Sequence, residues 1–197
     1  MTEEDKKEKK LEEIKKEAEQ KKCTVQKALY FTEEFLAGPM CGKCFPCSFG
    51  SYEARIRLKR LAGGTSTDDD IASIKRIASN MIEASMCKKG KDAAKFILDN
   101  IDSKEFTEHV SGICTKSECP EHIKYIIIPG ECTMCGICLD VCKDNAITGE
   151  KKKTFLSGYH PFEIALKRCT KCGECIKVCP TGAIIIVDAK DREAVGV

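Results

Sequence analysis

The sequence contains no tryptophan, and aromatic residues make up only 6% of it. These few aromatic residues are not interleaved with a basic stripe, and the formal net charge is only +2. The signature of a nucleic-acid-binding protein is therefore missing. Long apolar runs are missing too, because stretches such as 125–128 and 184–187 fall far short of the roughly 20 residues that cross a membrane. We expect neither a nucleic-acid partner nor a membrane span.

The N-terminal region lacks the apolar core of a signal peptide, since residues 1–22 are densely charged. This absence bears on the fifteen cysteines of the chain. A disulfide-rich secreted protein is one explanation for so many cysteines, but it needs an oxidising compartment. We therefore expect a cytoplasmic protein whose cysteines are reduced and bind metal.

Several motifs of cofactor chemistry are also absent. No G-x-G-x-x-G or other glycine-rich phosphate loop occurs, so the sequence predicts no bound dinucleotide. No C-x-x-C-H occurs, which excludes covalently attached haem. The C-x3-C-x2-C triplet of radical-SAM enzymes is missing, and no paired carboxylates or nucleophile–base set stands out. We expect no catalysis by this chain on its own.

What the sequence does contain is two matching cysteine runs of the form C-x2-C-x2-C-x3-C. They are Cys132, Cys135, Cys138 and Cys142, followed by Cys169, Cys172, Cys175 and Cys179. This is the spacing of two-cluster bacterial ferredoxins, in which the fourth cysteine of each run ligates the other 4Fe–4S cluster. Zinc ribbons also contain C-x2-C pairs, but two matching runs favour clusters. The sequence predicts one cluster on Cys132, Cys135, Cys138 and Cys179, and one on Cys142, Cys169, Cys172 and Cys175.

A further cysteine triplet, Cys41, Cys44 and Cys47, has no fourth cysteine at short range. Residues 24–36, the segment after Cys47, and residues 91–101 all have apolar side chains at helical spacing. Another helix, capped by Thr67 and led by three aspartates, ends near Cys87. We expect a small helical bundle in which three cysteines of one loop lie close to a fourth cysteine, Cys87, at the end of a later helix.

The motif Cys41-Gly-Lys-Cys44-Phe-Pro-Cys47 with a distant Cys87 resembles the C-terminal helical domain of the NADH-binding flavoprotein subunit of complex I. Bifurcating hydrogenases and NAD-dependent formate dehydrogenases share this domain. The resemblance implies that Cys41, Cys44, Cys47 and Cys87 hold one 4Fe–4S cluster. In the hydrogenase relatives a two-cluster ferredoxin domain follows, as it does here.

This resemblance covers roughly residues 24–190, but the family's flavin- and NAD-binding domain is missing. The resemblance therefore implies the electron pathway of the family for this chain, but not the NADH chemistry of the family. The layout also resembles the small iron–sulfur subunit of tungsten-containing benzoyl-CoA reductases.

Three cysteines remain, namely Cys23, Cys114 and Cys119. His109 stands close to Cys114 and Cys119, and histidine and cysteine grouped in a loop are typical ligands of tetrahedral zinc. Hydrogenase relatives have a similar cluster at this junction. We predict one zinc ion on His109, Cys114 and Cys119, with either Cys23 or His122 as fourth ligand. The alternative is that these are ordinary buried thiols.

Together these patterns predict an α+β protein in four parts. They are a charged helical arm at 1–23, a helical bundle at 24–106, a linker at 107–121, and a ferredoxin-like domain at 122–197. The predicted function is a non-catalytic electron-transfer subunit with three 4Fe–4S clusters, because complete cysteine quartets leave no open iron for a substrate.

We expect two partners in a hetero-oligomer. One is a large catalytic oxidoreductase subunit, for which the benzoyl-CoA reductase resemblance suggests a tungsten or molybdenum enzyme. The other is an electron donor, either a flavoprotein or a ferredoxin. The alternatives are a freely diffusing multi-cluster ferredoxin, a relay subunit of a bifurcating hydrogenase or formate dehydrogenase, and a zinc-filled structural protein.

Overall fold

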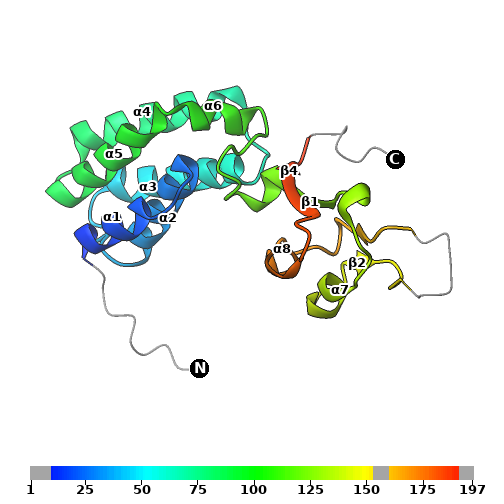
Figure 1. The fold of residues 1–197 in the computed structure, drawn as a ribbon. Helices are drawn as coiled ribbons and strands as arrows, with labels where there is room; N and C mark the ends of the chain where they lie inside the picture. The colour runs from blue at the N-terminus through cyan, green and yellow to red at the C-terminus, as the bar shows by residue number, and fades with distance from the viewer. Residues whose placement is uncertain (1–9, 153–159, 191–197) are drawn as a thin grey trace. The chain divides into compact units, whose positions relative to one another are not determined.

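The computed structural model describes residues 10–152 and 160–190, and the chain divides into two compact units between His122 and Ile123. Unit 1 is helical, whereas unit 2 combines short helices with short antiparallel strands (Figure 1). The predicted α+β fold, with a helical region at the N-terminal side, is confirmed. No helix within the two described ranges is long and apolar enough to cross a membrane.

Unit 1 is a bundle in which successive helices pack side by side. Its helices are α1 (Leu11–Glu19), α2 (Thr24–Ala37), α3 (Phe45–Ala62), α4 (Asp68–Ala84), α5 (Lys88–Ile101) and α6 (Lys104–Val110), followed by the 3-10 helix η1 (Pro120–His122). Each of α1 to α4 packs on the next helix, and α5 also packs on α2 (Figure 1). These contacts form a single helical bundle.

Two apolar clusters fill the bundle. The larger joins α2, α3, α4 and α5, where α4 contributes Ile74, Ala78 and Met81 at helical spacing. The smaller contains Phe31 and Phe96, whose ring centroids lie 4.1 Å apart, together with Cys44 and Cys47. Two thiols of the first triplet are therefore buried in a cluster that contains aromatic rings.

Helix α1 lies in the charged helical arm expected at residues 1–23, but it packs on the bundle. Its Ile14 and Ala18 are fully buried in the smaller apolar cluster, and Tyr30 Oη donates a hydrogen bond to Glu17 Oε2. Because apolar residues one helical turn apart meet a complementary surface on α2, this helix is part of the bundle. Residues 1–9 lie outside the described residues.

The segment 107–121, for which the sequence suggested a linker, lies within unit 1. Residues 107–110 belong to helix α6, and Cys114 and Cys119 are buried in the larger apolar cluster. His122 is also buried, and its Nε2 donates a hydrogen bond to the Leu61 carbonyl oxygen at 2.7 Å. These contacts attach the segment to the bundle and to α3 in particular.

The start of α4 contains an ion cluster centred on the buried Asp70. Its carboxylate accepts the Thr67 backbone N–H at 2.8 Å and lies 2.9 Å from Arg57 and 3.2 Å from Arg60. Burial raises the pKa of Asp70, but the bonds from Thr67 and the two arginines outweigh it and lower the pKa below 3.8. The carboxylate thus caps α4 and ties it to α3.

We expect Asp70→Ala to lower the free energy of unfolding by about 2 kcal/mol, because it removes a cap and leaves two arginines without their buried partner. The measurement is urea unfolding of the metal-loaded protein, with exposed Asp68→Ala as the matched control. Since the pKa is lowered on folding, this difference should be present at neutral pH and fade as the pH falls below 3.8. Equal unfolding midpoints for both variants at pH 7 would contradict it.

Unit 2 consists of two similar halves. Strand β1 (Ile123–Ile127) pairs antiparallel with β4 (Ile184–Asp188), and β2 (Ile147–Thr148) pairs with β3 (Glu163–Ile164). The short helices are α7 (Ile137–Val141) and α8 (Glu174–Val178), with the 3-10 helix η2 (Pro129–Glu131) after β1. The repeat in the sequence is thus a repeat in the fold, with a cysteine loop before each of α7 and α8.

Candidate metal centres

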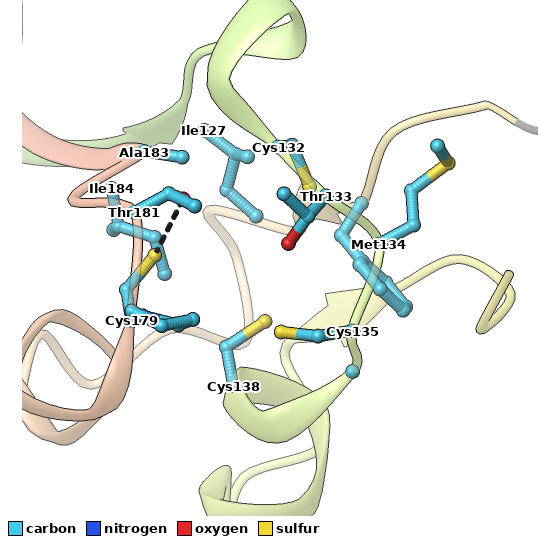
Figure 2. A pocket seen from close by; sticks show the side chains of 13 residues that line it. Ile127, Cys132, Thr133, Met134, Cys135, Cys138, Cys179, Thr181, Ala183 and Ile184 are labelled. Atoms are coloured by element: carbon cyan, nitrogen blue, oxygen red, sulfur yellow. Dashed lines mark hydrogen bonds between the residues drawn. The ribbon is translucent and has the colours of Figure 1, made fainter.

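The first site of unit 2 is a pocket lined by four cysteines from both runs. Cys132, Cys135 and Cys138 come from the loop before α7 and its first turn, whereas Cys179 comes from the end of α8. Figure 2 shows their sulfur atoms directed toward a common space. This is the grouping that crossed ligation requires. The other walls are mainly apolar, with Ile127, Met134, Phe162, Ala183 and Ile184 among them.

The second site has the same plan with the runs exchanged. Its pocket is lined by Cys169, Cys172 and Cys175 from the loop before α8 and its first turn, and by Cys142 from the end of α7. Its surroundings are more polar, since Asp144 and Glu174 also line it. The structure therefore brings together both quartets predicted from the sequence.

Left-handed backbone positions shape the two cysteine loops in the same way. Met134 and Lys171 have φ of 56° and 60° at matching positions, and the N-cap glycines Gly136 and Gly173 have φ of 79° and 80°. Glycine adopts such angles without the strain that a Cβ atom adds. Each loop turns sharply enough to place its third cysteine in the first turn of the following helix.

The thiols of each loop crowd one another. Burial, followed by the nearby Cys169, raises the pKa of Cys175 to about 11. Burial likewise raises the pKa of Cys138, with Cys132 and Cys135 adding to the effect. A group of thiols that cannot all ionise together requires a positively charged centre to become thiolates. The donor set therefore fits iron–sulfur clusters, which are bound by cysteine thiolates.

The quartet of unit 1 gathers around the beginnings of two long helices. Cys44 is the N-cap residue of α3 and Cys87 that of α5, while Cys44 and Cys47 are buried and Cys41 is exposed. The positive ends of the helix dipoles meet here, which favours an anionic thiolate centre. Burial raises the pKa of Cys47 to about 11, with further contributions from Cys44, Cys87 and Cys41. The other three thiols thus all lie within electrostatic reach of Cys47.

Gly90 lets α5 approach this quartet closely. A Cβ atom at this position would lie 3.0 Å from Cys47 Sγ and 3.0 Å from Ser85 Oγ. Such contacts are tighter than ordinary van der Waals packing, so a larger residue would push α5 away from the thiols. Sequence reasoning did not single out Gly90, because its role depends on tertiary contacts.

A fourth centre contains Cys23, His109, Cys114 and Cys119, all buried, with ligand atoms within 4.8 Å of one another. Cys23 Sγ lies 3.8 Å from Cys119 Sγ and 3.5 Å from His109 Nε2. In tetrahedral zinc with Zn–S bonds of about 2.3 Å, sulfur atoms lie about 3.8 Å apart. The spacing of this donor set therefore fits zinc.

Hydrogen bonds around the fourth centre orient its ligands. His109 Nδ1 lies 2.6 Å from the Glu105 carbonyl oxygen, which makes Nδ1 a donor, and its Nε2 faces Cys119 Sγ at 3.1 Å. Metal-binding histidines commonly have such a partner on their other ring nitrogen. Gln26 Nε2 donates a further hydrogen bond to Cys119 Sγ.

His122, the other candidate fourth ligand, lies beside the centre rather than in it. Its ring contacts that of His109 edge-on at 4.7 Å between centroids, but its Nε2 is bonded to the Leu61 carbonyl oxygen. Of the two candidates, the structure places Cys23 in the group. The orienting partners Gln26 and Glu105 had no signal in the sequence, because their contacts depend on how α2 and α6 pack.

Charge is unevenly shared among these buried ligands. Hydrogen bonds from Cys119 and Cys23 lower the pKa of Cys114, while hydrogen bonding to Cys114 raises that of Cys119. Burial disfavours the charged imidazole of His109, yet hydrogen bonds to Cys114 and Cys23 raise its pKa to about 10. A divalent ion would replace these protons, so metal binding here is coupled to proton release.

Comparison with known proteins finds two iron–sulfur regions, one in each unit of the structure. Residues 27–112 match the NADH-ubiquinone oxidoreductase-F iron-sulfur binding region, and residues 131–183 match a 4Fe-4S dicluster domain. The first match covers most of unit 1, and the second covers the cysteine loops of unit 2.

Three relatives illustrate the range of similar proteins. The NADP-reducing hydrogenase subunit HndC of Solidesulfovibrio fructosivorans is 32% identical over 66% of this chain and 27% of its own length. The NADP(+)-dependent formate dehydrogenase subunit beta of Moorella thermoacetica is 33% identical over 38% of this chain and 11% of its own length. An NADH-quinone oxidoreductase subunit of Streptomyces coelicolor is 33% identical over 46% of this chain and 20% of its own length.

The chain thus spans between 11% and 27% of these three relatives. The matched regions and the relatives confirm the resemblance that the cysteine motifs suggested. The chain thus contains a region similar to the NADH-ubiquinone oxidoreductase-F iron-sulfur binding region, followed by a region similar to a 4Fe-4S dicluster domain.

Proposed function

We propose that this chain is a non-catalytic electron-transfer subunit of a cytoplasmic oxidoreductase complex, and that it holds three 4Fe–4S clusters. The observation that supports this proposal most directly is the grouping of cysteines into complete quartets, two of them lining separate pockets. When bound, such clusters transfer one electron at a time without a change of ligands.

The residues around each quartet suit this role. Four cysteines per site saturate the ligand positions of a cubane cluster, which leaves none open for a substrate. Apolar side chains such as Ile127, Phe162 and Ile184 limit water at the first site of unit 2. The protein contribution is thus to bind the clusters, shield them and hold their positions fixed during electron transfer.

The names of the relatives indicate the kind of complex. They are subunits of an NADP-reducing hydrogenase, a formate dehydrogenase and an NADH-quinone oxidoreductase. We propose that a flavoprotein or a ferredoxin donates electrons to this chain, and that a large catalytic subunit, with tungsten or molybdenum as its metal, receives them. A relay subunit of a bifurcating hydrogenase or formate dehydrogenase would use the same residues.

The isolated chain should accept electrons from dithionite but not from NADH, because no nucleotide-binding loop occurs in its sequence. Visible absorbance of the metal-loaded protein, followed without oxygen, measures this directly. Bleaching by dithionite alone is the expected result. Bleaching by NADH without added protein would contradict the assignment of nucleotide chemistry to a partner.

We further propose that Cys23, His109, Cys114 and Cys119 bind one structural zinc ion. The four ligands close a complete tetrahedral set, as structural zinc sites do. Zinc would join the N-terminus of α2 to α6 and the segment after it, since Cys23 and His109 are 86 positions apart in the sequence. Closing so long a loop stabilises the folded bundle.

Metal analysis should find one zinc per chain, and Cys23→Ser should lose it while His122→Gln keeps it. Zinc affinity should fall as the pH is lowered, because Cys119 and the His109 imidazole must give up protons to bind the ion. Competition with a chromophoric chelator at several pH values measures this dependence. Protein with full iron but no zinc, or an affinity independent of pH, would rule out the site.

A further inference from the structure

Helix α3 is apolar on two opposite faces. Its buried face packs into the bundle through Cys47, Ala54, Leu58 and Leu61. The opposite face exposes four large residues three or four positions apart, namely Phe45 (72% exposed), Phe49 (54%), Tyr52 (50%) and Ile56 (37%). We call these four residues the α3 stripe. An apolar stripe along a helix normally faces a packing partner, so the α3 stripe lacks the cover that its composition predicts.

The stripe is organised rather than scattered. The rings of Phe45 and Phe49 stack with centroids 5.1 Å apart, and the Arg55 guanidinium lies 4.7 Å from the centroid of Tyr52. A helical segment of this length extends for about 17 Å. Contiguous exposed apolar surface of this kind marks interaction sites, whereas single exposed side chains do not.

One end of the stripe coincides with the unit 1 cysteine quartet. Phe45 stands between Cys44 and Cys47 in the sequence, and Met86, 84% exposed, directly precedes Cys87. A molecule seated on this surface would therefore touch residues adjacent to cluster ligands. Since electron-transfer rates fall steeply with distance, this is the part of unit 1 from which electrons can enter or leave most readily.

The charged residues nearest to these cysteines in the sequence are lysines. Lys43, Lys88, Lys89 and Lys91 are exposed and lie within four residues of a cysteine of the quartet. Residues 38–49 and 85–91 contain no aspartate or glutamate. A second copy of this chain would bring these lysines against their equivalents, which repel one another. The complementary partner instead has an acidic surface.

We propose that the α3 stripe and these four lysines dock an acidic one-electron carrier protein, which exchanges electrons at the unit 1 cluster. The apolar stripe would supply the buried centre of the interface, and the lysines its charged rim. This docking site rests on the proposed electron-transfer function, because its location matters only if the Cys41, Cys44, Cys47 and Cys87 quartet is a redox centre.

The first test is chemical cross-linking of the metal-loaded chain with a purified acidic ferredoxin. A carbodiimide joins carboxylates to lysine amines that form salt bridges, and mass spectrometry locates the joined residues. We expect cross-links from Lys43, Lys88, Lys89 or Lys91 to ferredoxin carboxylates, and we expect added salt to abolish them. Cross-links confined to lysines of unit 2, or from the four lysines only to carboxylates of this chain, would overturn the proposal.

The second test is a pair of matched double variants. Phe49→Ser with Tyr52→Ser removes the middle of the stripe, whereas Ile137→Ser with Leu166→Ser removes two exposed apolar residues of unit 2. We expect the first pair to weaken ferredoxin binding at least tenfold, and the second pair to leave it within a factor of about two. Equal affinities would show that the stripe takes no part in docking.

A dithionite control separates this proposal from the function on which it rests. Both double variants should keep their iron and remain reducible by dithionite, because the replaced side chains are exposed and are not ligands. Loss of ferredoxin binding with normal dithionite reduction supports the docking site. If dithionite fails to reduce the unsubstituted chain, the electron-transfer function itself is wrong.

Discussion

The Cys41→Ala variant, assembled without oxygen, is expected to contain about eight irons per chain, where the unsubstituted protein contains about twelve. Cys41 belongs to the unit 1 quartet but is exposed, whereas Cys44 and Cys47 are buried. Its replacement therefore removes one ligand without leaving a cavity in the core. We expect the whole cluster to be lost, because the three remaining thiolates leave one iron without a protein ligand and open to solvent.

The matched control is Cys114→Ala, which removes a ligand of the proposed zinc site. It should lose zinc and keep about twelve irons, since clusters and zinc use separate cysteines. Iron and sulfide analysis together with zinc analysis distinguishes the two variants. Unsubstituted protein with about eight irons would mean that the unit 1 quartet holds no cluster.

The second large effect concerns the crossed ligation in unit 2. Cys142→Ala combined with Cys172→Ala should leave about eight irons, because both cysteines line the same pocket and only one cluster is lost. Cys142→Ala combined with Cys135→Ala should leave about four, since the two cysteines line different pockets. Both Cys135 and Cys172 are exposed, so the two combinations disturb packing to a similar degree.

This comparison uses non-additivity to assign ligands. Two substitutions at one cluster site remove no more iron than one substitution does, whereas the iron losses from substitutions at separate sites add. If each run held its own cluster, the Cys142 and Cys135 combination would instead retain about eight irons, and the Cys142 and Cys172 combination about four. That reversed order would disprove the crossed arrangement.

The cysteine runs could be interpreted from the sequence because their chemistry is local. Spacings of two and three residues place thiols of one loop on one centre, and glycines after Cys135 and Cys172 permit the left-handed turn. The helices of unit 1 were predicted for a similar reason, since apolar spacing and the Thr67 cap are short-range signals.

Other features depend on contacts between residues distant in the sequence. The charge pattern of residues 1–22 predicts a solvated helix, yet Ile14 and Ala18 are buried because α2 and α5 offer an apolar surface. Cys23 could not be chosen over His122 from spacing alone, since it reaches His109 only through the packing of α2. The exposure of Phe45 and Tyr52 could not be predicted from the sequence either, because an apolar residue in a helix is normally expected to face the core.

The electron capacity of the isolated chain tests the central claim most directly. A coulometric titration without oxygen, followed by electron paramagnetic resonance, counts the electrons that the metal-loaded protein takes up and returns. We predict about three electrons per chain, one for each 4Fe–4S cluster, with uptake reversible on reoxidation. A chain that takes up none, or that loses its iron on reduction, would contradict the proposal that it transfers electrons between redox partners.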